Sequence, residues 1–172
     1  LKIFQDHGFK TDGEIVFFTE EQATSALKTI PDQFRVEARN PDRSVVIGDG
    51  FPIFAPGYGA PFLIDPEKGK VVPGIKDYED LIRLAQSLPH QDLSGHLLVE
   101  PQDIPAEMAH LYMLRANILY SDKPFVGSTE GKEGAQHTLE LIDILFGKNE
   151  DQYHTLGLIN PLSPLRYSKD MI

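Results

Sequence analysis

The stretch Leu158-Ile159-Asn160-Pro161-Leu162-Ser163-Pro164-Leu165 joins an apolar strand to a stiff polar loop. Proline cannot donate a hydrogen bond to a sheet ladder, so a strand predicted from Leu156 to Ile159 must end at Asn160. The Asn160 amide is thereby held at the carboxyl end of a strand, where parallel α/β folds build their binding sites. An Asn-Pro pair also ends strands as a simple turn, and that alternative stays open.

Two similar strand ends precede this one. His96-Leu97-Leu98-Val99 runs into Glu100-Pro101-Gln102-Asp103, and Pro124-Phe125-Val126 runs into Gly127-Ser128-Thr129. The apolar periodicity between these strands predicts helices near residues 105–120 and 132–147. The strands recur about every 30 residues, the size of a βαβ unit, so we predict a parallel sheet with right-handed crossovers.

This alternation of strand and helix fits an open doubly wound sheet or a closed (β/α)₈ barrel. The chain has no G-x-G-x-x-G after the first predicted strand and no G-x-x-x-x-G-K-[ST]. Dinucleotide-binding and P-loop folds are therefore disfavoured. We predict residues 75–172 to be the first part of a (β/α)₈ barrel, with about three of its βα units. The open edge of the third strand predicts marginal stability or self-association.

Residues 1–74 are predicted to be a separate elaboration made of a helix and β-hairpins. Thr19-Glu20-Glu21-Gln22 has the form of a capping box, which predicts a helix over residues 19–30. The predicted hairpin strands are Val45–Ile47 with Phe51–Phe54, and Phe62–Ile64 with Lys70–Val72. The loop between the hairpins, Ala55–Pro61, is either a connector or a flap that brings Tyr58 close to a ligand.

Both ends of the sequence fall in predicted helices. Leu1–Gly8 has the pattern of the last turns of a helix, with Gly8 as its left-handed stop. Tyr167 and Met171 are spaced as at the start of an amphipathic helix, and the sequence stops at Ile172. We therefore expect a piece of a longer protein.

Composition excludes several classes of function. The 172 residues carry a net charge of −10, which argues against nucleic-acid binding. There is no cysteine, so disulfides, thiolate metal sites and cysteine nucleophiles are absent. No apolar run is long enough for a membrane span or a signal peptide, and we expect a soluble cytoplasmic protein. The 6 histidines are scattered, with no H-E-x-x-H, so structural roles are favoured over metal ligation.

Five stretches, in order along the chain, resemble the trimethylamine methyltransferase family. They are Ala38–Arg43, Pro56–Phe62, Val99–Pro105, Asp122–Ser128 and Ile159–Leu165. The resemblance implies a (β/α)₈ barrel with a β-rich elaboration on its N-terminal side. It also implies methyl transfer from a tertiary or quaternary amine, such as trimethylamine or glycine betaine, to the cobalt of a corrinoid carried by a separate protein. Some family members carry pyrrolysine, at a position that lies beyond Ile172.

The resemblance implies that Asn160 belongs to the substrate site, through the match at Ile159-Asn160-Pro161. The strand-end argument places four further residues near it, and the Pro-Gly-Tyr-Gly loop adds one. These five are Glu100, Gln102, Ser128, Ser163 and Tyr58. Glu100 and Asp103 also suit an acid/base pair, although Asp103 suits a helix cap equally well. A different barrel enzyme, such as a metal-assisted hydrolase, and a non-catalytic module both remain open, and we expect this chain alone to be inactive.

Overall fold

The computed structural model describes residues 1–149, 151–161, 163 and 165–167, in two compact units, Leu1–Phe34 and Arg35–Ile172. The first unit contains α1 (Lys2–Asp6), β1 (Lys10–Asp12), β2 (Ile15–Phe17) and α2 (Glu20–Leu27). Strands β1 and β2 form an antiparallel hairpin. The predicted helix is confirmed: the Thr19 hydroxyl accepts from the Gln22 N–H over 3.2 Å, and the Gln22 side chain accepts from the Thr19 N–H over 2.9 Å. It ends at Leu27, three residues before the predicted limit.

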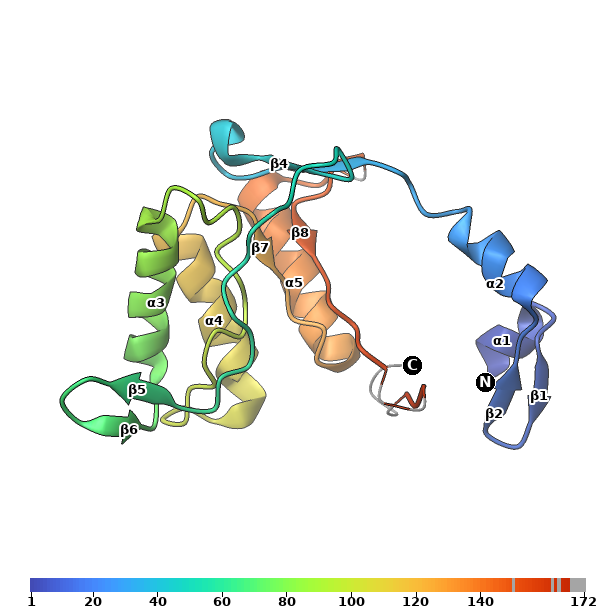
Figure 1. Cartoon of the computed structure of the whole chain (residues 1–172), viewed down its shortest axis with the longest axis horizontal. Helices are drawn as coiled ribbons and strands as arrows, with labels where there is room; N and C mark the ends of the chain where they lie inside the picture. Colours follow the sequence, from blue (N-terminus) through green and yellow to red (C-terminus); the bar gives the residue numbers. More distant parts are fainter. Residues whose placement is uncertain (150, 162, 164, 168–172) are drawn as a thin grey trace. The chain divides into compact units, whose positions relative to one another are not determined.

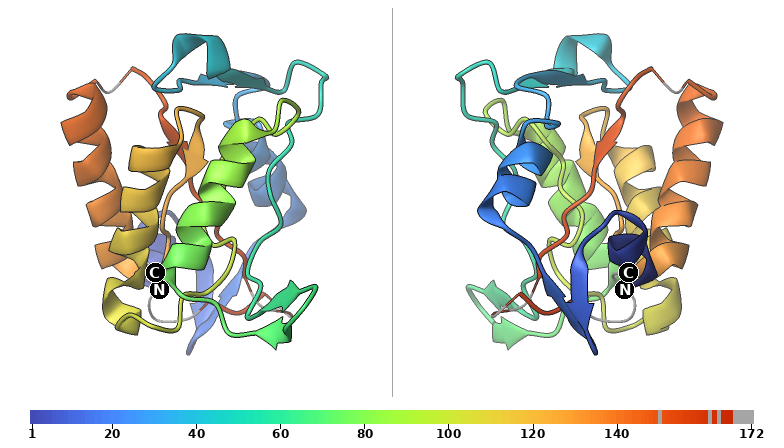
Figure 2. Two further views of the ribbon diagram at one scale, coloured as in Figure 1. Left: turned by 90° about the vertical axis from the view of Figure 1, so that its left-hand side faces the viewer. Right: turned by 90° about the vertical axis from the view of Figure 1, so that its right-hand side faces the viewer.

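The second unit alternates short strands with three long helices. Its elements are β3 (Phe34–Val36), the 3₁₀ turn η1 (Pro41–Arg43), β4 (Val45–Ile47), β5 (Leu63–Asp65), β6 (Gly69–Val71), α3 (Ile75–Ser87), α4 (Ala106–Tyr120), β7 (Phe125–Val126), α5 (Gly131–Phe146) and β8 (Thr155–Leu156). The predicted helices α4 and α5 are confirmed to within about one residue at each end. Helices α3, α4 and α5 lie side by side in one layer (Figures 1 and 2).

Strands β7 and β8 pair in parallel, with Phe125 opposite Thr155 and Val126 opposite Leu156, as predicted for the second and third strands. The first predicted strand, residues 96–100, forms no regular ladder, and that prediction was wrong. The segment still runs beside β7, because Val126 N–H donates to the Gly95 carbonyl over 3.4 Å. Gly95 has φ of 88°, which interrupts an extended chain. Closure of these elements into a barrel stays a prediction.

The two hairpin predictions have different outcomes. The second is confirmed, since β5 and β6 pair antiparallel with Asp65 opposite Gly69. The first is wrong, because β4 pairs with β3 instead of with residues 51–54. Residues 51–54 do not pair with β4 because the Phe54 carbonyl bonds to another segment. It accepts from Asp92 N–H at 2.9 Å and from Leu93 N–H at 3.1 Å.

The main core lies between α3, α4 and residues 98–99. Tyr78 and Ile82 of α3 are fully buried there against Met113 of α4. A buried polar network crosses this core: the Tyr78 hydroxyl donates to the His96 carbonyl and accepts from Asn117 Nδ2 at 2.9 Å. Ser94 adds a 2.7 Å bond to Asn117 Oδ1. Burial raises the pKa of the Tyr78 phenol, so it stays a neutral donor.

Some predictions fall where the chain is not described. The helix predicted to begin at Tyr167 lies beyond the described residues, as do Leu162 and Pro164 of the strand-ending loop. Within the described part of the chain, no helix has the length and apolar character needed to cross a membrane. The division predicted between residues 74 and 75 stays a prediction.

Candidate functional site

Glu100 and Gln102 lie together where the first apolar segment ends. Both side chains are exposed, and Gln102 Nε2 donates to the Glu100 carbonyl over 3.3 Å. Their backbones are fixed by bonds to other segments: Glu100 N–H donates to the Ala60 carbonyl at 3.1 Å, and Gln102 N–H donates to the Pro73 carbonyl at 2.9 Å. The side chains therefore project from a rigid backbone.

Asp103 is a helix cap. Its Oδ1 accepts from Ile75 N–H over 2.8 Å, at the start of α3 rather than of the following helix α4. A Cβ at Gly74 would lie 2.6 Å from Asp103 Oδ2, so the carboxylate packs directly on this glycine. Asp103 therefore has a capping role, at α3 and not at the helix that follows it, and the carboxylate has a fixed partner.

Ser128 lies under the first turns of α5 and is 2% exposed. Its N–H donates to Thr138 Oγ1 over 3.0 Å, and its hydroxyl accepts from Glu130 N–H over 3.4 Å. A Cβ at Gly134 would come within 2.7 Å of the Ser128 Oγ. These contacts join the end of β7 to α5 and leave the hydroxyl buried.

Asn160 and Ser163 are exposed beyond β8. The ends of β7 and β8 are tied together upstream of them, by Gly127 N–H to the Leu156 carbonyl at 2.8 Å and Thr129 Oγ1 to the Leu158 carbonyl at 2.6 Å. The structure ends β8 at Leu156, so the strand predicted to run from Leu156 to Ile159 is shorter than expected, and Asn160 lies in the exposed segment that follows the parallel pair. It brings Glu100 and Gln102 into contact, and it separates Ser128 from any open surface.

The loop that carries Tyr58 is fixed along its length. Phe54 bonds to residues 92 and 93, Gly59 N–H donates to the Leu97 carbonyl at 2.6 Å, and Ala60 pairs in parallel with Val99. Tyr58 itself is 52% exposed. Partial burial, followed by the charge of Glu130, raises the pKa of its phenol. These bonds hold the loop in place, so a fixed connector is favoured over a movable flap.

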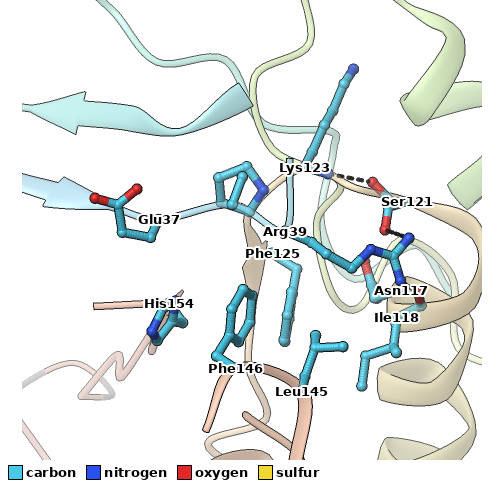
Figure 3. A pocket seen from close by; sticks show the side chains of 12 residues that line it. Glu37, Arg39, Asn117, Ile118, Ser121, Lys123, Phe125, Leu145, Phe146 and His154 are labelled. Carbon is cyan, nitrogen blue, oxygen red and sulfur yellow. Dashed lines mark hydrogen bonds between the residues drawn. The ribbon is translucent and has the colours of Figure 1, made fainter. Parts of the chain in front are cut away.

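A pocket lies at the opposite, amino end of β7 (Figure 3). It is small, with room for about one water molecule, and part of it is open to solvent. Its lining residues include Glu37, Arg39, Ile118, Phe125, Phe146 and His154. The Arg39 guanidinium is committed to the last turn of α4, since it donates to the Ile118 and Ser121 carbonyls. A cation at a helix C-terminus satisfies orphan carbonyls, so Arg39 stabilises the fold here.

His154 is the least satisfied side chain of this pocket. It is 7% exposed, its ring stacks on Phe146 with centroids 3.9 Å apart, and neither ring nitrogen has a hydrogen-bond partner among the described residues. The neighbouring Glu37 is occupied, since Ser44 Oγ donates to it at 2.8 Å and Arg35 Nε donates at 2.8 Å. The Ser44 bond is the main cause that lowers the pKa of Glu37, against the opposing effect of burial.

A contact outside this pocket joins two of the stretches that resemble the family. Asn40 Nδ2 donates to Asp122 Oδ2 over 3.1 Å, and Asn40 N–H donates to the Asp122 carbonyl over 3.2 Å. The next residue, Lys123, is buried and donates to the Ala85 and Leu88 carbonyls at 2.7 and 2.8 Å, at the end of α3. Both stretches stand out by their resemblance to the family, but nothing in their sequence predicts this structural role. The feature that the two stretches share is a proline with charged residues beside it.

Two histidines are in contact between α4 and α5. His110 Nε2 and His137 Nδ1 are 2.8 Å apart with nearly parallel rings, and the charge of His110 reaches the buried His96. Burial lowers the pKa of His96 to about 4. In residues 1–149 and the shorter described segments, no group of three or more His, Asp or Glu side chains is arranged to hold a metal ion.

Two comparisons with known proteins bear on the site. A family model described as trimethylamine methyltransferase matches residues 1–172, the whole chain. The chain is also 41% identical over 175 residues to a glycine betaine methyltransferase of Desulfitobacterium hafniense (strain Y51). That match covers 100% of this chain and 36% of the relative, so the chain spans about a third of the length of the relative.

Proposed function

The chain belongs to the trimethylamine methyltransferase family, and from this we propose that the protein carrying it removes a methyl group from a methylated amine and passes it to the cobalt of a corrinoid protein. The observation that carries the proposal is the family match over residues 1–172. The relative named as a glycine betaine methyltransferase favours a quaternary ammonium with a carboxylate as the substrate. Trimethylamine is the other candidate, from the name of the family.

We place the substrate at the carboxyl end of β7, β8 and residues 97–100. Asn160, Glu100, Gln102 and Tyr58 are exposed in this region, and hydrogen bonds fix the backbones of Glu100 and Gln102. The support for this end is chemical. A carboxylate and an aromatic ring suit an ammonium, and the amide N–H groups of Asn160 and Gln102 can donate to a substrate carboxylate.

The reaction asks this chain to bind and orient its substrate. A C–N bond breaks, the methyl carbon moves in line to cobalt, and the amine nitrogen keeps the electron pair. The corrinoid supplies the nucleophile, so no acid/base pair is needed for this step. Asn160 would donate to a polar group of the substrate and fix its direction, and Gln102 would do the same from the neighbouring segment.

The decisive experiment replaces Asn160 by alanine in the protein that contains this chain. Calorimetric titration with glycine betaine should show binding weakened by about 1–3 kcal/mol, because a polar ligand group loses its partner. Asn149→Ala is the matched control, an exposed asparagine in the connection between α5 and β8. Melting temperatures of both variants should stay near the parent. Unchanged affinity for Asn160→Ala would return this residue to a strand-ending turn.

A methyl-transfer assay with a reduced corrinoid protein tests the reaction itself. We expect the parent to form demethylated amine and methylated corrinoid in equal amounts, because each methyl group lost by the amine is gained by the cobalt. Transfer to water or to a thiol in place of cobalt would contradict the proposed acceptor while leaving the family assignment intact.

A further inference from the structure

Residues 157–160, the segment that contains Asn160, continue past the paired part of β8. The ladder between β7 and β8 stops at Leu156, whose carbonyl accepts a hydrogen bond from Gly127 N–H at 2.8 Å. The four residues that follow are all exposed. A segment outside a ladder has no regular hydrogen bonds to fix its backbone, so the position of the Asn160 side chain needs another support.

Thr129 supplies this support from the end of β7. Its hydroxyl donates to the Leu158 carbonyl over 2.6 Å, and in the described part of the chain this is the one hydrogen bond that residues 157–160 make. Its methyl group packs on the same segment, since a Cβ at Gly157 would lie 3.0 Å from Thr129 Cγ2. Both groups of one side chain therefore hold the backbone two and three residues before Asn160.

Thr129 is itself held by the residues around it. Its carbonyl accepts from Gly131 N–H at 2.9 Å. The preceding residue, Ser128, is buried, and its N–H donates to Thr138 Oγ1 of α5 over 3.0 Å. A side chain on a fixed backbone can set the position of a neighbouring segment. Thr129 thus links the segment beyond β8 to the end of β7 and to α5.

We propose that Thr129 is a positioning residue of the amine site and holds Asn160 toward the substrate. This inference rests on the proposed function, in which Asn160 touches the substrate, and Thr129 acts through Asn160. Leu158 is exposed, so water can replace the Thr129 hydroxyl at its carbonyl and the effect on folding is small. Substrate binding is affected more, because a hydrogen bond from the Asn160 amide depends on its distance and angle.

The test separates the two groups of the Thr129 side chain. Thr129→Val keeps its shape and removes the hydroxyl, whereas Thr129→Ser keeps the hydroxyl and removes the methyl group. Thr155→Val is the matched control, because the Thr155 hydroxyl also joins the two strands, by a 2.9 Å bond to the Phe125 carbonyl, but within the paired ladder. Binding of glycine betaine is measured calorimetrically in the protein that contains this chain, with Thr129→Val made alone and together with Asn160→Ala.

We expect Thr129→Val to weaken glycine betaine binding about fivefold, with a melting temperature near that of the parent. Thr129→Ser and Thr155→Val should bind as tightly as the parent. With Asn160→Ala already present, Thr129→Val should cause no further loss, because its effect passes through that amide. Full affinity in Thr129→Val, an equal loss in Thr129→Ser, or a loss that adds to that of Asn160→Ala would overturn the proposal.

A second measurement does not depend on the ligand. Chymotrypsin should cut after Leu158 faster in Thr129→Val than in the parent or in Thr155→Val, because cleavage needs a loosened segment. Unchanged cleavage in Thr129→Val would overturn the proposal. A parent that binds neither glycine betaine nor trimethylamine would overturn the proposed function, and faster cleavage in Thr129→Val would then still show that Thr129 holds the segment.

A further variant replaces Thr129→Val if that variant does not fold. Gly157→Ala adds a Cβ that crowds Thr129 Cγ2 at 3.0 Å, so it should displace the segment and weaken glycine betaine binding. Thr129→Ser removes the crowded methyl group, and adding it to Gly157→Ala should restore binding. Full affinity in Gly157→Ala, or no restoration by Thr129→Ser, would overturn the proposal.

Discussion

The side chain of Asn40 donates a hydrogen bond to the carboxylate of Asp122 over 3.1 Å, across 82 positions of sequence. Gln86 of α3 donates to the other carboxylate oxygen at 2.7 Å. One aspartate thus joins the segment after β3, the end of α3 and the entry to β7. The two sequence stretches that meet here are among those that resemble the family, and their contact is structural.

Asp122→Asn should lower the free energy of unfolding at pH 7 and make it vary less with pH in acid. Burial alone would raise the pKa of this carboxyl, but the bonds from Gln86 and Asn40 outweigh it and hold the pKa below the ordinary 3.8. A carboxyl with a depressed folded pKa stabilises the protein above the unfolded value, and this contribution is lost as pH falls through the folded one. Urea unfolding at pH 7 should therefore show a loss of about 1–3 kcal/mol. As pH falls from 3.8 through the lower pKa of the folded state, the variant and the parent should converge.

Asp80→Asn is the control for this experiment. Asp80 is an exposed carboxylate of α3 that pairs with Lys76 and Arg83. Exposed pairs contribute about 0–1 kcal/mol, so this variant should stay close to the parent at pH 7. A loss as large as that of Asp122→Asn would show that any carboxylate of α3 gives the effect.

Arg39→Met should destabilise the C-terminal turn of α4. The guanidinium donates to the Ile118 and Ser121 carbonyls, and methionine would leave both without this partner. We expect a loss of about 1–3 kcal/mol in the free energy of unfolding, with faster hydrogen exchange in the last turn of α4. Lys76→Met, which breaks only an exposed pair at 3.5 Å, should cost under about 1 kcal/mol. Equal losses would mean that Arg39 contributes no more than a surface charge.

The sequence predicts local structure in this chain better than it predicts the partners of its segments. Helices were predictable because their apolar periodicity and the Thr19 cap are local signals. The hairpin at Gly48-Asp49-Gly50 was not, because Phe54 bonds to residues 92 and 93 and removes residues 51–54 from pairing. A contact between segments so far apart has no signal in the local sequence.

The same distinction holds for the site. That Asn160 lies outside a strand was predictable, since proline cannot continue a sheet ladder. The end of β8 at Leu156 was not, because it follows from pairing with the short strand β7 and not from Pro161. The burial of Ser128 was not, because it depends on Thr138, ten residues later and on the facing side of α5.

Gly95→Ala should loosen the Tyr58 loop. Gly95 has φ of 88°, and a Cβ there would lie 2.7 Å from Leu98 Cδ2 and 3.2 Å from Pro56 Cγ. We expect a loss of about 1–3 kcal/mol and faster proteolysis within residues 54–60. Gly57→Ala in the same loop meets no atom within 4 Å and should leave both measurements unchanged. Equal proteolysis of the two variants would mean that Gly95 does not fix the loop.

His96→Leu should remove acid sensitivity between pH 6.5 and about 4. The imidazole is 1% exposed, neither ring nitrogen has a partner among the described residues, and burial, aided by the charge of His110, lowers its pKa from 6.5 to about 4. The folded protein therefore holds His96 neutral where the unfolded chain takes up a proton. Stability from this group is full above pH 6.5 and is lost as pH falls toward 4, by at most on the order of 3 kcal/mol. Leucine has no proton to bind and gives up no hydrogen bond, so urea midpoints from pH 7 to pH 4 should fall less steeply than in the parent. His90→Leu, at an exposed histidine before the same segment, should keep the parent slope. If the urea midpoints of His96→Leu fall as steeply with pH as those of the parent, then protonation of His96 does not destabilise the folded protein, and the prediction is wrong.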